Sequence, residues 1–491
     1  MGMEQNHSEN FELVRDENAR KSEPDAPALI ANGSGRLVYQ GGRMAQWFVE
    51  AAFQRERVLR FLWWRPSAPV FARKAKLFFL LLSFLSLVAG LVLYKVIFIA
   101  NTSVLSSFWT FYGIIVSIFL ISRIPYAYLY EDRHDAEYPD SAYPSVSVVI
   151  AAKDEERGIA RTIATCVESQ YPGEIECIVV DDGSTDGTKE EVLHEQGVYG
   201  NRVKLIAFPE NKGKREAMAA GVNEAQGEII VFVDSDSFLA SDAVRRITEH
   251  FLADERIGAV SGNTKAENAN DNLLTRMQSI QYAVSFDVYK TCESVHRSVT
   301  CCPGCFSAYR KKAIGPLIQK WKEQRFLGVR GTFGDDRGLT NFVLRTWDVI
   351  YCENAKATTL VPAKFSMYWR QQLRWKKSWI REGVLAGLFM WKKYPLASLG
   401  FYIHFSFPFL GPVLAGKVLV RSLTTDNPLL FAVFMLGFML IGMTFGLFVR
   451  IYRHAENWMY MPFFSILFVS ILIWQMPYAL LTLRNGHWGT R

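Results

Sequence analysis

The chain has 491 residues, of which 50% are hydrophobic and 14% aromatic, and its formal net charge is +7. This is too apolar for an ordinary soluble protein, and its basic residues lie beside apolar segments, where they suit anionic lipid and phosphate. We expect no nucleic-acid partner, because no nucleic-acid-binding motif is present. The seven cysteines form no secreted-type framework and no cleavable signal sequence precedes the first apolar run, so the domain between the apolar ends is expected to be cytosolic and reduced.

The first 76 residues are predicted to contain a tail and one helix. Residues 1–40 are polar and lack periodicity, which predicts a disordered tail. In residues 41–76, aromatic and aliphatic side chains alternate with arginines between Met44 and Trp64, as in an amphipathic helix on a membrane surface. A soluble helix packed on the domain is the alternative interpretation.

Residues 77–130 are predicted to form two transmembrane helices. The runs 77–100 and 106–128 are each long and apolar enough to cross a hydrocarbon core of ~30 Å. Basic residues flank the pair on its outer sides, whereas the link Asn101-Thr102-Ser103 carries no charge. The positive-inside rule therefore places both outer flanks in the cytosol.

From Ser145 the pattern changes to short β-rich runs alternating with helical stretches, which predicts a parallel, helix-covered sheet in a domain over 145–362. The runs are 146–152, 175–181, 203–208 and 228–234. Ligands of such sheets bind at the carboxyl ends of the strands. Acidic residues follow three of the runs there: Asp154, Asp182, and Asp234 with Asp236. We expect these carboxylates to share one nucleotide site.

The run Gly-Glu-Ile-Ile-Val-Phe-Val-Asp-Ser-Asp at 227–236 delivers two carboxylates at the end of a buried strand. Such hard oxygen ligands suit Mg²⁺ or Mn²⁺ beside a diphosphate, where the cation offsets the charge of a nucleotide leaving group. An isolated Asp-x-Asp is also common in surface turns. The metal prediction therefore depends on the surrounding motifs.

Several motifs together resemble one family. Val-Val-Asp-Asp-Gly-Ser at 179–184 is shared by many glycosyltransferases, while Gly-Asp-Asp-Arg-Gly-Leu-Thr-Asn at 334–341 and Gln-Gln-Leu-Arg-Trp at 371–375 are more discriminating. From Ser145 to its end the chain resembles the processive inverting glycosyltransferases with the GT-A fold, specifically hyaluronan synthases. The resemblance predicts an α/β GT-A (Rossmann-like) cytosolic glycosyltransferase domain embedded between transmembrane and interfacial helices.

The resemblance also implies roles for individual residues. Asp336 is the candidate general base, because an acceptor hydroxyl attacking C1 of a UDP-sugar must lose its proton; a surface Asp335–Arg337 pair is the alternative. The residues expected to bind the nucleotide sugar are Ala152, Asp154, Asp182, Lys214, Asp234, Arg374, Trp488 and Arg491. Asp236 is expected to bind Mn²⁺ or Mg²⁺. The residues expected to bind the acceptor are Cys302, Gly304, Asp335, Gln371 and Trp375.

Two of these expectations have a simpler alternative. Lys214 belongs to Asn-Lys-Gly-Lys-Arg at 211–215, which a solvated lysine cluster would also explain. Arg374 can bind a diphosphate and the Trp375 indole can support a sugar, on interface helices predicted over 363–395. A plain amphipathic helix would explain the same apolar stripe.

The loop Cys301-Cys302-Pro303-Gly304-Cys305 lies where the family has its priming loop beneath the acceptor. Hyaluronan synthases more usually have a single cysteine near Ser-Gly-Pro here, so this chain departs from the pattern. A zinc site would need a fourth ligand that the local sequence lacks. We expect a reduced, partly buried loop.

The C-terminal segment is expected to form two transmembrane helices over 396–450 and a membrane-embedded or interfacial segment over 460–484, which Pro477 interrupts. Residues 485–491 end in Trp-Gly-Thr-Arg, which resembles the cytosolic gating tail of hyaluronan synthases. We therefore expect four crossings in all and a cytosolic tail. A third C-terminal crossing would place that tail outside.

The resemblance implies a monomeric enzyme of the plasma membrane that transfers sugars from UDP-GlcNAc and UDP-GlcA to a growing hyaluronan chain and exports the polysaccharide. A chitin, chitooligosaccharide or other capsular polysaccharide synthase is an alternative, as is a non-processive lipid-carrier glycosyltransferase. A transporter or receptor with a degenerate nucleotide fold is a further one. Intact Asp234, Asp236, Asp336 and Arg374 argue against that last class.

Overall fold

The computed structural model describes residues 29–31, 37–39, 104–132 and 138–484, and six residues between 82 and 93, which are helical. The predicted amphipathic helix over 41–76, most of the first predicted span and the tail 485–491 lie outside the described residues. Near the N-terminus, β1 (Leu29–Ala31) pairs antiparallel with β2 (Leu37–Tyr39). The polar composition of residues 1–40 did not predict this pair.

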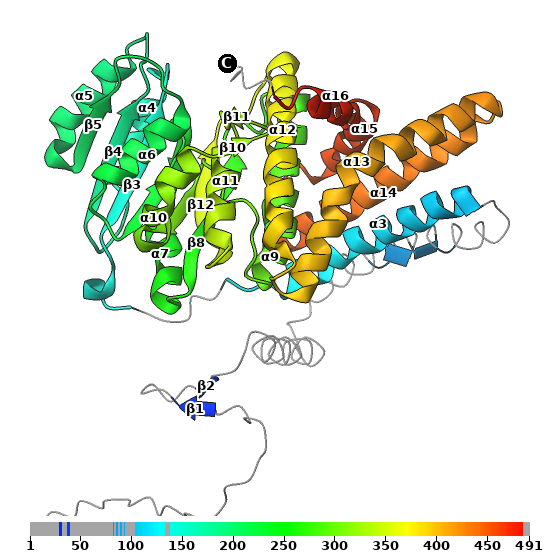
Figure 1. Ribbon diagram of the computed structural model, residues 1–491, viewed down its shortest axis with the longest axis horizontal. Helices are drawn as coiled ribbons and strands as arrows, with labels where there is room; N and C mark the ends of the chain where they lie inside the picture. Colours follow the sequence, from blue (N-terminus) through cyan, green and yellow to red (C-terminus); the bar gives the residue numbers. More distant parts are fainter. Residues whose placement is uncertain are drawn as a thin grey trace, which may run out of the picture. The chain divides into compact units, whose positions relative to one another are not determined.

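The catalytic domain is built on an eight-stranded mixed sheet, with strand order β5-β4-β3-β6-β9-β8-β12-β7 (Figure 1). Its strands are β3 (Val146–Ala152), β4 (Ile175–Asp181), β5 (Val203–Ala207), β6 (Ile229–Phe232), β7 (Ser237–Leu239), β8 (Ile257–Ala266), β9 (Ser307–Arg310) and β12 (Asp348–Thr359). A separate small hairpin joins β10 (Arg325–Phe326) to β11 (Val329–Arg330). The strands β5, β4, β3 and β6 run parallel, as predicted.

Beyond β6 the sheet is mixed and not only parallel as predicted, although β8 and β12 still pair parallel. Strand β9 inserts antiparallel between β6 and β8, and β7 pairs antiparallel with the end of β12. β9 is short and contains Ser307 and Arg310, so it lacks the apolar run that identified the first four strands. β6 itself ends at Phe232, which leaves Asp234 and Asp236 in the loop that follows.

Helices cover both faces of the sheet, and alternate residues of β3 supply the two cores. Val148 and Ile150 pack with residues of α4 (Ile159–Val167), α5 (Thr188–Tyr199) and α7 (Ala243–Ala253). Val149 points to the other face. There it packs with residues of α6 (Lys214–Glu224), α10 (Lys311–Lys322) and α11 (Asp335–Leu344).

Between β8 and β9 the chain forms one long helical stretch with a π-helical middle. α8 (Leu273–Val284) leads into η3 (Ser285–Lys290), which leads into α9 (Thr291–Val295). α12 (Phe365–Met390) stands between the catalytic domain and the apolar helices (Figure 1). It contacts α11 on one side and two C-terminal helices on the other.

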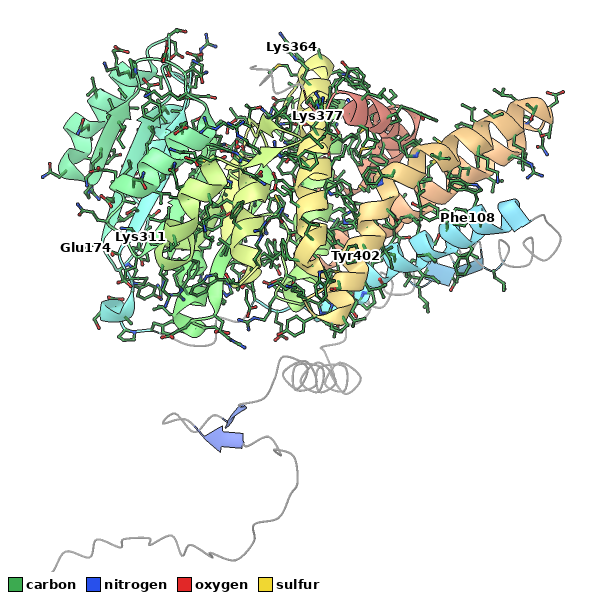
Figure 2. All side chains as sticks on the ribbon, in the orientation of Figure 1. Phe108, Glu174, Lys311, Lys364, Lys377 and Tyr402 are labelled. Atoms are coloured by element: carbon green, nitrogen blue, oxygen red, sulfur yellow. The ribbon has the colours of Figure 1, made fainter. Side chains whose placement is uncertain are left out.

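Within the described part of the chain, four helical segments are long and apolar enough to cross a membrane. They are Phe111–Leu129 within α3 (Val104–Leu129), α13 (Pro395–Thr424), α14 (Pro428–Arg453) and Trp458–Leu481. Apolar side chains such as Phe108 on α3 and Tyr402 on α13 are exposed, whereas Lys364 precedes the start of α12 and Lys377 lies midway along it (Figure 2).

The last of these segments is broken. It consists of η4 (Trp458–Tyr460), α15 (Met461–Ser470), η5 (Leu472–Trp474) and α16 (Gln475–Leu481). The break lies before Pro477, and α16 packs against α12 and α13. This geometry suits a membrane-embedded or interfacial segment, and the number of C-terminal crossings remains a prediction.

Candidate active site

One cavity of about 1600 Å³ opens at the carboxyl ends of β3, β4 and β6 and extends along α12. Most of the predicted site residues that the structure describes line it: Ala152, Asp154, Asp182, Lys214, Asp234, Asp236, Gly304, Asp335, Asp336, Gln371, Arg374 and Trp375. Trp488 and Arg491 lie outside the described residues. The three acidic strand ends therefore converge as the sequence predicted.

Asp182 lies just after β4 and accepts hydrogen bonds from the loop before α6. The Lys212 N–H donates to Asp182 Oδ1 over 2.7 Å, and the Gly213 N–H donates to Oδ2 over 3.0 Å. Burial raises the pKa of Asp182, although these hydrogen bonds oppose that shift. The carboxylate thus fixes the backbone that starts α6 at Lys214.

Lys214 is paired with Asp234 across the cavity, its Nζ donating to Oδ1. Burial alone would lower the pKa of Lys214, but Asp234 outweighs burial and raises it. Lys214 is therefore a fixed cation beside the strand end, and the alternative of a solvated lysine cluster does not describe it.

The loops after β3 and β4 are joined through Asp154. Its φ of 53° lies in the left-handed region, which few residues other than glycine adopt. The Asp154 N–H donates to Ser184 Oγ over 3.0 Å, and Asp154 Oδ1 accepts from the Thr185 N–H over 2.8 Å. These bonds hold the β3 loop, including Ala152 at its start, against the β4 loop at the cavity rim.

Asp234 and Asp236 offer a carboxylate pair of the kind that Mg²⁺ and Mn²⁺ use. One Asp234 oxygen is engaged by Lys214, and Asp236 Oδ1 accepts from Thr359 Oγ1 over 3.4 Å. Mg²⁺ typically takes one or two protein carboxylates and completes its shell with substrate phosphates and water. The pair fits such an ion without a third acidic residue.

Gly304 packs directly against the Lys214–Asp234 pair. A Cβ placed at Gly304 would lie 2.8 Å from Asp234 Oδ1 and 3.2 Å from Lys214 Nζ. No side chain larger than hydrogen fits there without moving the pair. The cysteine loop therefore touches the residues predicted to bind the nucleotide.

The prediction that Cys302 faces the acceptor is wrong. Cys302 is fully buried in the core, and its N–H donates to Thr340 Oγ1 over 2.9 Å. Its neighbour Cys301 lines the cavity instead, with Sγ 3.6 Å from Asp336 Oδ2. Burial, followed by Asp336, raises the pKa of Cys301 to about 11. Adjacent residues point in different directions here, and the run of cysteines gave no way to choose between them.

Asp336 lies in the first turn of α11 with its carboxylate at the cavity. Oδ1 accepts from the Arg337 N–H over 2.7 Å, and the Asp336 backbone oxygen accepts from Thr340 Oγ1, also over 2.7 Å. Among the described residues no cation pairs with this carboxylate. The alternative interpretation, a surface pair of Asp335 with Arg337, is not found among those residues either.

Asp335, expected to bind the acceptor, is nearly buried at the cavity wall and is paired with Arg215. Its Oδ1 lies 2.7 Å from Arg215 Nε, and both side chains are about 5% exposed. Arg215 also approaches Glu382 on α12, with NH2 3.9 Å from Oε1, and Arg381 bonds the same carboxylate over 2.8 Å. Asp335 therefore belongs to a charge network that joins α6, α11 and α12.

On α12, Gln371, Arg374 and Trp375 all line the cavity. The Trp375 indole is 38% exposed, and its ring centre lies 6.4 Å from that of Tyr282. Part of the Trp375 ring is therefore exposed at the cavity.

The chain matches the family model described as Glycosyl transferase family 2 over residues 147–317. It is 27% identical to a hyaluronan synthase of Streptococcus pyogenes serotype M3 over 423 residues, which cover 84% of this chain and 96% of the relative. It is 34% identical to an N-acetylglucosaminyltransferase of Rhizobium meliloti over 247 residues, which cover 50% of this chain and 57% of the relative. The chain is a hyaluronan synthase-like glycosyltransferase of family 2.

The fold of this glycosyltransferase resembles that of a mannosyltransferase from Pyrobaculum calidifontis, solved with GDP-Man and Mn²⁺, with a TM-score of 0.52 at 18% identity. That similarity covers 76% of this chain and 95% of the solved one. It confirms the predicted GT-A fold. With its apolar helices, the glycosyltransferase is a multi-pass membrane protein with a cytosolic catalytic domain.

The glycosyltransferase cavity has a second end that sequence motifs did not identify. It is lined by residues of η3 and of the membrane helices: Phe119, Arg123, Phe286, Tyr289, Lys290, His404, Phe405 and Pro408. The aromatic and basic residues of the η3 stretch come from a π-helical segment, a feature common at functional sites. Only the fold brings these separate segments together, so no local spacing could have revealed them.

Proposed function

We propose that this glycosyltransferase is a processive hyaluronan synthase of the plasma membrane that acts as a monomer. It would transfer sugars from UDP-GlcNAc and UDP-GlcA, with inversion, to a growing chain that passes out between its membrane helices. The observation that carries the proposal is the single cavity, which runs from Asp182 and Lys214, past Asp336, to Arg123 on α3 and Pro408 on α13. A polymer extended at Asp336 can enter the helices without leaving the enzyme.

The positive charge at the second end of the cavity, beside η3 and the membrane helices, favours an anionic polymer. Arg123, Lys290 and Arg337 all line the cavity, and in the described part of the chain none of them pairs with a carboxylate. The Arg123 guanidinium instead stacks over the Phe119 ring at 4.2 Å and donates to Phe119 O over 3.3 Å. A polymer with uronic acid carboxylates would compensate these cations, whereas neutral chitin would not.

The proposed reaction uses Asp336 as general base. Asp336 takes the acceptor hydroxyl proton while the hydroxyl oxygen bonds to C1 and the bond from C1 to the diphosphate oxygen breaks, so UDP leaves with the electron pair. Attack from the face opposite the leaving group inverts C1. Asp182 and Lys214 would hold the uridine, Arg374 would offset the diphosphate charge, and Gln371 with Trp375 would support the acceptor sugar.

Asp236, with Asp234, would hold Mn²⁺ or Mg²⁺ beside the diphosphate. Support comes from the fit of two carboxylates to such an ion and from the Mn²⁺ bound by the structurally similar mannosyltransferase. When bound, the cation supplies charge compensation for the departing diphosphate.

The test is to incubate the purified full chain with labelled UDP-GlcNAc and UDP-GlcA, singly and together, and to digest the product with linkage-specific enzymes. We expect long polymer only with both donors, and complete degradation by hyaluronan lyase. Polymer from UDP-GlcNAc alone would support the chitin-type alternative, to which the similarity with the Rhizobium N-acetylglucosaminyltransferase points. Transfer of one sugar to a lipid would defeat the processive proposal.

A further inference from the structure

A second cluster of metal-ligand side chains lies outside the cavity, where the chain leaves α3 and enters the catalytic domain. It contains Asp132, His250 on α7 and Cys352 on β12, whose ligand atoms all lie within 4.8 Å of one another. The His250 Nε2 is 2.9 Å from Asp132 Oδ1, and the Cys352 Sγ is 3.4 Å from Asp132 Oδ2. All three side chains are nearly or fully buried, being at most 8% exposed.

We propose that Asp132, His250 and Cys352 bind a divalent cation of the zinc class that fastens the end of α3 to the catalytic domain. One sulfur, one imidazole nitrogen and one carboxylate oxygen form the mixed ligand set that zinc accepts. Binding replaces the Cys352 thiol proton, which passes to water, with a bond from Sγ to the metal. Water fills the remaining tetrahedral position.

The spacing of the ligand atoms suits this ion after a small adjustment. With ordinary zinc bond lengths, a tetrahedral shell separates nitrogen and oxygen ligands by about 3.4 Å, and sulfur and oxygen ligands by about 3.6 Å. The Cys352 Sγ lies 3.4 Å from Asp132 Oδ2, close to that value, whereas the His250 Nε2 lies beside the other oxygen, Oδ1, so the carboxylate would turn to present one oxygen to the metal. The imidazole and carboxylate would move apart by roughly 0.5 Å on binding.

Surrounding backbone groups hold two of the ligands in place. The Ala355 N–H donates to Cys352 Sγ over 3.3 Å, a bond that becomes stronger with a thiolate. The Asn354 N–H donates to Asp132 Oδ2 over 2.7 Å. Such outer bonds orient metal ligands and are typical of protein metal sites.

The cluster lies where the end of α3 meets β12, so a metal there would strengthen that connection. Tyr130, just after α3, donates its hydroxyl hydrogen bond to the Tyr351 backbone oxygen, next to Cys352. The segment between membrane helix and domain is thus already bound to β12 at one residue. A metal shared by Asp132, His250 and Cys352 would fix the same connection more strongly, because metal binding stabilises only the folded arrangement.

The test measures metal in the purified full chain. We expect zinc in a one-to-one ratio after passage over a chelating resin, retained in Asp236→Asn, which alters the donor-site cation, and lost in His250→Ala and Cys352→Ser. Matched controls are His194→Ala, an exposed histidine, and Cys177→Ser, a buried cysteine outside the cluster; both should keep their zinc.

Cobalt provides a readout that is independent of the variants. Cobalt exchanged into the wild-type chain should give a thiolate-to-cobalt charge-transfer band, which oxygen ligands at the donor site cannot produce. A wild-type chain without zinc and without this band would overturn the proposal. Asp132, His250 and Cys352 would then be a metal-free hydrogen-bonded cluster.

Discussion

Arg215 and Asp335 form a buried ion pair whose members are the immediate neighbours of Lys214 and Asp336. The Arg215 Nε lies 2.7 Å from Asp335 Oδ1. Lys214 contacts the strand-end carboxylate Asp234, and Asp336 is the proposed base. The pair therefore sets the distance between the proposed donor-binding and proton-accepting residues, and through Glu382 it extends to α12.

We predict that Arg215→Met destabilises the protein by about 3–5 kcal/mol, because it leaves Asp335 buried without its cation. The double variant Arg215→Met/Asp335→Leu should recover part of the loss. Denaturant unfolding in detergent measures both. Arg330→Met is the control, since Arg330 forms a partly exposed pair with Glu216 and should cost no more than about 1 kcal/mol. If Arg215→Met and Arg330→Met lowered the free energy of unfolding equally, the buried pair would have no special role.

Asp336→Asn should reduce polymerisation roughly 10²-fold or more, because the amide keeps the size of the carboxylate but cannot accept the proton. UDP affinity should survive, since Asp336 is not among the residues proposed to hold the nucleotide. Initial rates and calorimetric UDP binding separate the two effects. Asp242→Asn, on the domain surface, should retain full activity. An active Asp336→Asn enzyme would remove Asp336 from the mechanism.

Asp236→Asn should abolish sugar transfer and weaken the Mn²⁺-dependent part of UDP binding, because an amide is a poor substitute for a carboxylate ligand. The protein should stay folded, since Asp236 lies in a loop at the cavity. UDP titrations with and without Mn²⁺ test this directly. Undiminished turnover of the wild-type enzyme in excess EDTA would contradict the metal requirement.

The parts of the site that the sequence predicted are those encoded by contiguous residues. Val146–Ala152 and Ile175–Asp181 are strands with the predicted bounds, because apolar β-branched runs end there at acidic turns. β9 was missed because it is short and partly polar, and its neighbours in the sheet come from distant segments.

Side-chain direction was harder to predict than position. Cys301 and Cys302 are equivalent in the sequence, and only the packing of Cys302 against Thr340 decides which one faces the cavity. The sequence did not predict that Asp335 pairs with Arg215, which lies 120 positions earlier in the chain. Neither relationship follows a local spacing, so both required the tertiary structure.

Lys376 should make the stability depend on pH in the alkaline range. Burial lowers its pKa from 10.5 to about 8, so the folded state disfavours the charged form. Between about pH 8 and pH 10.5, Lys376 is protonated in the unfolded chain but largely neutral in the folded one. The free energy of unfolding therefore rises with pH in this range. Lys376→Met should remove this rise. Thermal unfolding across that range measures it, with exposed Lys189→Met as control; parallel curves for wild type and Lys376→Met would contradict the prediction.

The C-terminal tail is where membrane topology and catalysis are expected to meet. Gln475, at the start of α16, forms two hydrogen bonds with α12. Lys376 Nζ donates to Gln475 Oε1 over 2.9 Å, and Gln475 Nε2 donates to the Trp369 backbone oxygen over 3.1 Å. α16 thus lies beside the helix that carries Arg374, which favours a cytosolic tail. A third C-terminal crossing remains the competing topology.

If Trp488 and Arg491 close over the bound UDP-sugar, deleting residues 486–491 should reduce catalysis severely while expression and membrane insertion persist, because no membrane helix is lost. Replacing the same residues with a Gly/Ser sequence of equal length controls for chain length and should be equally inactive. A cysteine at Thr490, in a background depleted of reactive cysteines, should react with a membrane-impermeant maleimide only after the cytosolic side is opened. Labelling from outside intact cells would establish the extra crossing, and full activity after the deletion would exclude the tail from catalysis.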